Sequence, residues 1–292
     1  MIPMRSRLGL VVLVVAPAVA AAQRPAPARR AAARADTVEH SPFIPGGHWR
    51  PGPPAPIPEP APDNRAAAPA AALDSAGYFA RPNGLLLRPG TSVFQLLLHR
   101  DTSLVPLGTR TVTIAESTLA GVADWLIAET RAGTAIATSD SLHLHRPDLT
   151  PMRWTATNGL AQLAVSFTAD SMFAALQDYQ GRGSFAAGLP PGALITTGMV
   201  DGVLELLPLG AGYHTAASVV SIESGAPRAV PATIDVEREE QIPLGAQPVD
   251  CWVVVLRAGT LEKRYWVAKV PQRVVRTEQQ TSAGLLTEML VE

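Results

Sequence analysis

The sequence predicts a mainly β protein: a curved antiparallel meander, forming a half-barrel or open barrel, with one or two short helices and a disordered N-terminal tether. Three observations lead to this prediction. The 292-residue chain begins with a short apolar leader, continues with a stretch rich in proline and alanine, and then carries many strand-like segments separated by turn residues. The expected division is 1–22, 23–72 and a single β-rich domain over 73–292.

The leader has the pattern of a secretory signal peptide. Arg5 and Arg7 precede an apolar run that contains Pro17, and small residues follow it at the expected cleavage point before Gln23. The run is too short for a membrane span, which needs roughly 20 residues. A lipoprotein would carry a cysteine at the cleavage point, whereas the single cysteine is Cys251. We therefore expect export to the periplasm or the outer cell envelope, without a lipid anchor.

Residues 23–72 are expected to form a disordered linker. Stretches such as RPAPARRAAARAD and RPGPPAPIPEPAPDN contain few residues that could build a core. The island SPFIPGGHWRPG is the one part of this segment that could dock onto another surface. The simpler expectation is that the segment acts as a spacer that holds the folded domain away from a surface.

Strand signals dominate residues 73–292, and turn residues separate them. With one cysteine no internal disulfide can form, so stability must come from the core. Helices are predicted at ADSMFAALQDY (169–179) and TGMVDGVLELLPL (197–209), and GRGSF (181–185) reads as a flexible turn. The predicted strands are VFQLLLHR, GTRTVTIAEST, GVADWLIAETR, TAIATSDSLHLHR, LAQLAVSFTAD, ASVVSIES, ATIDVEREEQIP, DCWVVVLR, EKRYWVAK, QRVVRTEQQT and LLTEMLVE.

Charge and motifs narrow the function classes. The 24 Lys and Arg residues nearly balance the 25 Asp and Glu residues, and no basic patch stands out, so nucleic acid is not an expected partner. Phosphate-binding glycine loops, zinc-protease motifs and the nucleophile elbow are all missing, so we expect neither a cofactor nor an enzyme. No later run is apolar enough to span a bilayer, so the protein is not expected to be integral to the membrane. A hydrolase with an unrecognised site is the least favoured alternative, and the oligomeric state stays open.

Cys251 lies in VDCWVVVLR, a strand that is apolar on both faces. Because successive residues of a strand point to opposite faces, both sides of this strand must be covered, either by protein or by a bound apolar ligand. We therefore predict that Cys251 is a buried core residue. A reactive thiol would need a neighbouring cation and some exposure, whereas its neighbours are Asp250 and Trp252.

The aromatic residues admit two interpretations. They fill the core, or some of them line the inside of a curved sheet that holds an apolar molecule, such as a lipid or the acyl chain of a protein. In the second case the ligand would lie between the sheet and the helical element around Met199–Leu207. The alternative is a structural or protein-interaction domain with a self-filled core. The candidate lining residues are Trp125, Trp154, Trp252, Trp266 and Leu206.

His143 and His145 are weak candidates for metal ligands. Their spacing puts both side chains on one face of a strand, which can chelate a metal when a third ligand comes from a neighbouring strand. Two histidines alone make a poor site, and we favour a solvated hairpin face. The conceivable additional ligands are His99, Asp140, Asp148 and His214.

Several stretches resemble an exported bacterial family, the domain-of-unknown-function family 3108. They are ESTLAGVADWLIAETR with SDSLHLHRPDLTPMRW, LELLPLGAGYHTA, and VDCWVVVLRAGTLEKRYWVAKVPQRVVRTEQ with GLLTEMLVE, in which Trp266, Lys269 and Arg273 match the closing strands. That family is similar to open-barrel carriers that move lipoproteins or lipids across the periplasm. The resemblance implies a curved antiparallel sheet with a helix or two across its concave side, and it implies no catalytic residues.

Overall fold

The computed structural model describes residues 79, 81–133, 137–179, 181–195, 198–223, 226–245 and 247–291. The expected signal peptide and linker lie outside the described residues. The elements are η1 (Gly84–Leu86), β1 (Gly90–Arg100), β2 (Ser103–Leu119), β3 (Val122–Ala132), β4 (Thr138–His145), β5 (Pro151–Thr157), β6 (Gln162–Phe167), β7 (Ser171–Asp178), β8 (Gly181–Gly188), β9 (Leu194–Ile195), α1 (Gly198–Leu204), β10 (His214–Glu223), β11 (Ala226–Leu244), β12 (Gln247–Ala258), β13 (Leu261–Lys269), β14 (Gln272–Thr281) and β15 (Gly284–Leu290).

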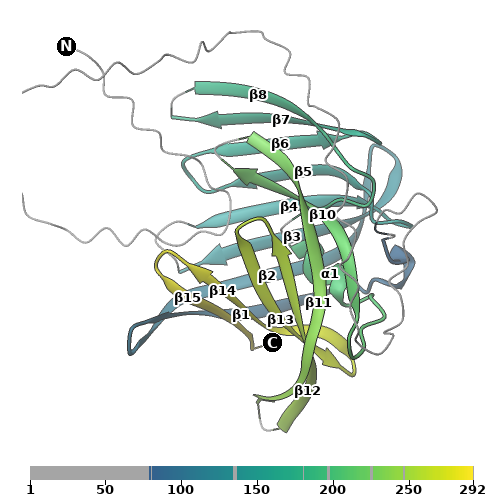
Figure 1. Cartoon of the computed structure of the whole chain (residues 1–292). Helices are drawn as coiled ribbons and strands as arrows, with labels where there is room; N and C mark the ends of the chain where they lie inside the picture. The colour runs from purple at the N-terminus through teal and green to yellow at the C-terminus, as the bar shows by residue number, and fades with distance from the viewer. Residues whose placement is uncertain are drawn as a thin grey trace, which may run out of the picture.

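These strands form a single 15-stranded sheet with the order β8-β7-β6-β5-β4-β3-β2-β1-β15-β14-β13-β12-β11-β10-β9. Strands that follow each other along the chain pair antiparallel, except that β9 and β10 pair parallel and that β8 and β9 stand at opposite ends of the order. The pairing of β1 with β15, from Phe94 opposite Leu290 to His99 opposite Leu285, joins the two meanders. The sheet curls so that β11 contacts β7 and β8 from the other end of the strand order (Figure 1). The predicted open, curved β architecture is confirmed.

Two local predictions are wrong. Residues 169–179 were expected to be helical, but Ser171–Asp178 form β7, whose buried and exposed residues alternate between its neighbours β6 and β8. Pairing on both edges outweighs the helix preference of Ala, Met, Leu and Gln, because intrinsic propensities differ by less than about 1 kcal/mol per residue. The expected turn at 181–185 is the start of β8. By contrast, α1 lies within the second predicted helix.

The inner face of the curled sheet holds most of the core. Phe94 of β1, Val112 of β2, Ile127 of β3 and Leu142 of β4 point inward and belong to one contiguous cluster of buried side chains. The helix α1 lies against this face, between the two halves of the sheet (Figure 1), and all seven of its residues are buried. None of the helices in the described ranges has the length and apolarity of a membrane-spanning helix.

Candidate functional site

A group of charged side chains lies inside this apolar core. We call it the interior charge cluster. The strands contribute charged residues at inward positions, on a face whose other side chains are largely apolar, and α1 adds one carboxylate. The cluster consists of Arg110 (β2), Glu129 and Arg131 (β3), Asp201 (α1), Lys263 (β13) and Glu288 (β15).

Arg110 is the centre of the cluster, and its side chain is 1% exposed. Its Nη2 donates to Oε2 of Glu129 at 2.8 Å and to Oδ2 of Asp201 at 2.6 Å, and its Nη1 donates to Oε2 of Glu288 at 3.0 Å. The guanidinium also lies over the ring of Phe94, 5.3 Å from its centroid. One cation therefore ties β3, β15 and α1 together.

Arg131 and Thr277 complete the bonding of the two glutamates. Arg131 donates from Nε to Glu129 at 3.1 Å, and its Nη2 is 3.0 Å from Oε1 of Glu288. Thr277 donates its hydroxyl to Glu288 at 3.0 Å. Lys263 approaches the same carboxylate at 3.6 Å. Arg131 is 17% exposed and Lys263 14%, so these two side chains are the most exposed members of a cluster that is otherwise buried.

The carboxylates of the cluster differ in proton affinity. Burial alone would raise the pKa of Glu129, but Arg110 and Arg131 outweigh it and lower that pKa to about 2. Glu288 also has a lowered pKa, since Lys263, Arg110 and Arg131 outweigh its burial. Burial raises the pKa of Asp201 in spite of Arg110. Asp201 is therefore the most easily neutralised carboxylate among these three.

Asp201 is also the least satisfied member. Its Oδ2 accepts from Arg110, whereas its Oδ1 is buried without a hydrogen-bond partner. Beyond Asp201, Glu205 follows α1, and burial together with Asp201 raises its pKa to about 7. Asp140 on β4, next to Glu129 in the register, likewise has its pKa raised to about 7 by burial and by Glu129.

Two kinds of contact hold α1 in place. Gly198 packs so tightly that a Cβ there would lie 2.9 Å from Cγ2 of Ile127 and 3.1 Å from Cγ1 of Val112. At the other end, the Gln272 amide donates to the carbonyls of Leu204 and Leu207, each at 2.8 Å. With the Asp201–Arg110 ion pair, these contacts hold a short helix over the apolar inner face.

The predicted lining residues do not all come together. Trp125 and Trp154 lie on the inner face, where each is 1% exposed and packed in the core. Trp252 packs at the edge of the core beneath Lys269, whose Nζ is 3.9 Å from the ring centroid. Trp266 lies on the opposite face of the sheet, against Arg276 at 4.5 Å. Leu206 is partly buried in the turn after α1.

The two candidate histidines are engaged with different carboxylates. His143 contacts Asp124 through Nδ1, and His145 contacts Asp148 at 2.8 Å. Of the other conceivable ligands, His214 contacts Asp235, and Asp140 accepts a hydrogen bond from Trp154 at 3.3 Å. Within the described ranges no group of three or more His, Cys, Asp or Glu side chains is arranged to hold a metal ion.

Cys251 is buried and is not in a disulfide. Val253, Val254, Val255 and Leu256 are buried with it, so this strand is covered on both faces as predicted. Burial, Asp250 and Glu240 raise the pKa of the Cys251 thiol to about 11. The position of Cys251 in the core is confirmed.

The interior charge cluster was missed at the sequence level. Its signal is an isolated charge at an inward position of an otherwise apolar strand, as Glu288 in LLTEML and Arg110 in TRTVT. An inward, unpaired charge is costly, so each such residue implies a partner across the sheet. The partners could not be assigned, because the pairing of β1 with β15 that brings Arg110 to Glu288 is not visible in the sequence.

Comparison with known proteins finds similarity in structure but not in sequence. No protein-family model matches the chain, family 3108 included. No curated protein matches it either. Among solved structures, a β-barrel-like protein of the domain-of-unknown-function family DUF1849 from Brucella abortus is similar, with 10% sequence identity and a TM-score of 0.44 over 70% of this chain and 97% of that one. That protein brings no residue role to this chain.

Proposed function

We propose that this chain is an exported, non-enzymatic protein of the bacterial cell envelope that binds an apolar ligand, a lipid or an acyl-bearing protein, inside its curved sheet. The ligand would take the space that α1 occupies. This proposal extends to the periplasm or outer envelope as the compartment, which the leader with Arg5, Arg7 and Pro17 favours. Kinship with family 3108 is part of the same proposal.

The observation that carries the proposal is the position of α1. It covers an apolar wall that includes Val112 and Ile127, yet it is only seven residues long and contains two glycines. A helix of this length and composition has little stability of its own. Its place therefore depends on packing and on a few polar contacts, which an alkyl chain entering the interior could replace.

The cost of the interior charge cluster points the same way. The attraction within a buried ion pair barely offsets the free energy of desolvating the two charges, so apolar packing of the same volume is often as stable or more stable. Asp201 leaves one carboxylate oxygen without a partner in this cluster. The ion pair with Arg110 therefore fixes the position of α1 but adds little net stability. Such an attachment suits a helix that a ligand can displace better than a permanent part of the core.

The non-enzymatic part of the proposal rests on how the carboxylates are used. Glu129 and Glu288 are each bonded to two arginines, and their lowered pKa values keep them ionised at neutral pH. These two glutamates therefore do not exchange protons near pH 7, as a general acid or base must, whereas Asp140 and Glu205, with pKa values of about 7, lie outside this argument.

A second function has its own support. Trp125 and Trp154 are packed among core side chains, which favours a structural or protein-interaction domain whose sheet is closed by its own residues. In this case α1 is a permanent part of the core and no ligand enters.

The experiment compares the wild-type protein with Asp201→Asn. The substitution keeps the shape of the side chain and removes the charge that attaches α1 to Arg110, while Glu129 and Glu288 still neutralise the guanidinium. Native mass spectrometry of the protein from a bacterial envelope should show bound lipid, and a fluorescent fatty acid should bind Asp201→Asn several-fold more tightly than wild type. The matched control is Asp235→Asn, which alters a half-exposed ion pair with Arg257 outside the cluster.

The result decides between the two functions. Binding that rises in Asp201→Asn and is unchanged in Asp235→Asn supports displacement of α1. Folded wild-type and Asp201→Asn proteins that both lack lipid and do not bind the fatty acid would establish the self-filled domain instead.

A further inference from the structure

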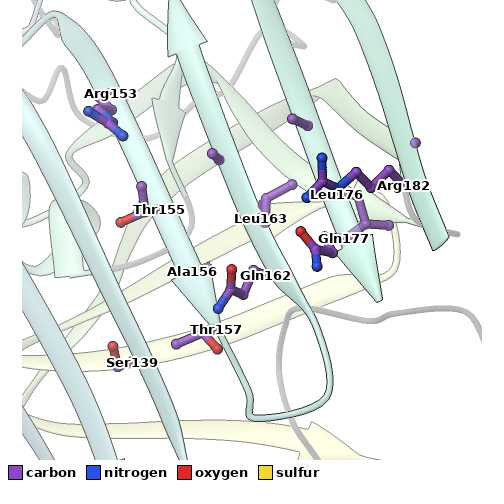
Figure 2. Close-up of a pocket in the computed structure, with 13 residues that line it drawn as sticks. Ser139, Arg153, Thr155, Ala156, Thr157, Gln162, Leu163, Leu176, Gln177 and Arg182 are labelled. Carbon is purple, nitrogen blue, oxygen red and sulfur yellow. The ribbon is translucent and has the colours of Figure 1, made fainter. Parts of the chain in front are cut away.

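A trough lies on the outer face of the sheet, on the strands from β4 to β8 (Figure 2). Its volume is about 510 Å³. Its polar side chains, such as those of Arg153 and Gln162, point away from the core, because their neighbours along each strand are buried residues of the inner face, of which Ala156 and Leu163 also line the trough. The trough is therefore separate from the interior charge cluster.

The floor of the trough is made of small residues. Ala164 of β6 and Ala175 of β7 are direct cross-strand partners, and both are exposed. The next pair on one side is Gln162 with Gln177, two long amide side chains. Alanines between longer side chains leave a depression that brings a ligand close to the sheet.

Arginines stand at two corners of the trough. Arg182 of β8 is the cross-strand partner of Gln177, and Arg153 lies on β5, three strands from β8 and beyond the other side of the alanine floor. Both side chains are exposed, and neither forms an ion pair with any residue in the described ranges. Arg257, by contrast, contacts three carboxylates on the outer face of β11–β13.

The trough is positively charged in a chain that is nearly neutral. The residues that line it include these two arginines and no aspartate or glutamate, although the whole chain has a formal charge of −1. Free guanidinium groups are well suited to carboxylates, to which they can donate two parallel hydrogen bonds. The trough therefore selects an anionic partner.

We propose that the trough binds an extended acidic peptide segment of a partner protein. Its carboxylates would pair with Arg153 and Arg182, and its peptide groups would bond to the paired amides of Gln162 and Gln177, which donate and accept as peptide groups do. The alanine floor leaves room for a main chain. Three strand spacings separate β5 from β8, roughly 14 Å, which an extended peptide of about four or five residues covers.

The test uses the full chain and a fluorescein-labelled deca-glutamate peptide, with binding followed by fluorescence anisotropy. Arg153→Gln and Arg182→Gln should each weaken binding about 3- to 10-fold, the double variant should abolish it, and binding should fall as salt rises. Arg100→Gln is the matched control, because Arg100 is an exposed arginine at the end of β1, outside the trough. A deca-glutamine peptide should not bind.

A second variant tests the shape of the site without changing charge. Ala164→Trp fills the floor from an exposed position, so it should leave the melting temperature unchanged and block the peptide. Wild type that fails to bind deca-glutamate, or Arg100→Gln that weakens binding as much as the trough variants do, would overturn the proposal. Polygalacturonate could instead bind more tightly than the peptide, with the same dependence on Arg153 and Arg182. That result would assign the trough to an anionic glycan and overturn the proposal of a peptide partner.

Discussion

At the scale of single residues, Cys251 shows how burial removes reactivity. The side chain is fully buried, and its thiol donates to the Val249 carbonyl, with Sγ 3.5 Å from the oxygen. Since burial, Asp250 and Glu240 raise its pKa to about 11, almost no thiolate exists at neutral pH. The nearby cation of Lys269 lowers the pKa too little to offset these effects.

We expect native protein to resist a thiol reagent that labels Cys251 quickly in denaturant. Cys251→Ala should cost on the order of 1 kcal/mol of unfolding free energy through a small cavity, and leave ligand binding unchanged. Mass spectrometry of the labelled protein and urea unfolding measure the two effects. Fast labelling of the folded protein would contradict this prediction.

Asp140 gives the protein a pH dependence. Its folded-state pKa of about 7 lies above the usual 3.8, so the folded state holds the proton more tightly than the unfolded state does. The stability that results is fully present below about pH 4 and is lost as the pH rises towards 7. Glu205, with a pKa of about 7, acts in the same direction. Glu129, with a pKa of about 2, acts in the opposite direction, and only as the pH falls below about 4.5.

Asp140→Asn should therefore flatten the loss of stability between pH 5 and pH 7. The difference from wild type should reach on the order of 2 kcal/mol at pH 7, because one unit of pKa difference corresponds to about 1.4 kcal/mol and water screens part of it. Thermal melts across this pH range measure the effect, with the exposed Asp101→Asn as control. A wild-type melting temperature that changes between pH 5 and pH 7 by the same amount as that of Asp140→Asn would refute the role of Asp140.

At the scale of elements, β7 shows what the sequence pattern could and could not predict. Its residues favour a helix, and only the pairing with β6 and β8 makes them a strand. Strands with continuous apolar runs, such as β12, were predictable because their own residues decide the outcome. The interior charge cluster was not, since Arg110, Glu129 and Glu288 meet only through the register of four adjacent strands.

The strand assignment of β7 makes a sharp prediction about two adjacent alanines. Ala174 is 3% exposed and faces the core, whereas Ala175 is exposed on the outer face. Ala174→Asp should cost about 3 kcal/mol or more, because it buries an unpaired charge, and Ala175→Asp should cost less than about 1 kcal/mol. Urea unfolding of both variants measures the contrast. Similar losses at the two positions would mean that residues 171–178 do not alternate as a strand.

At the scale of the whole molecule, the sheet encloses a core that draws on nearly every described strand. The sequence of residues 23–72 is rich in alanine and proline and contains few large apolar side chains that could add to it. Ordering such a segment would cost more conformational entropy than its burial could return.

A chain that starts at Leu73 should therefore melt within a few degrees of one that starts at Gln23. Differential scanning calorimetry of the two chains provides the comparison. A drop of 10 degrees or more would show that the SPFIPGGHWRPG island docks onto the domain, and Trp49→Ala in the longer chain should then reproduce the loss.

The pairing of β1 with β15 also bears on how the chain is made. The other pairings in the described sheet join strands that follow each other along the chain, so they can form soon after synthesis. One edge of β1 stays open until residue 284 has left the ribosome and β15 begins. An open apolar strand edge invites pairing with other chains. A ribosome that stalls before β15 should therefore release a product that aggregates, although fourteen of the fifteen strands have already been synthesised.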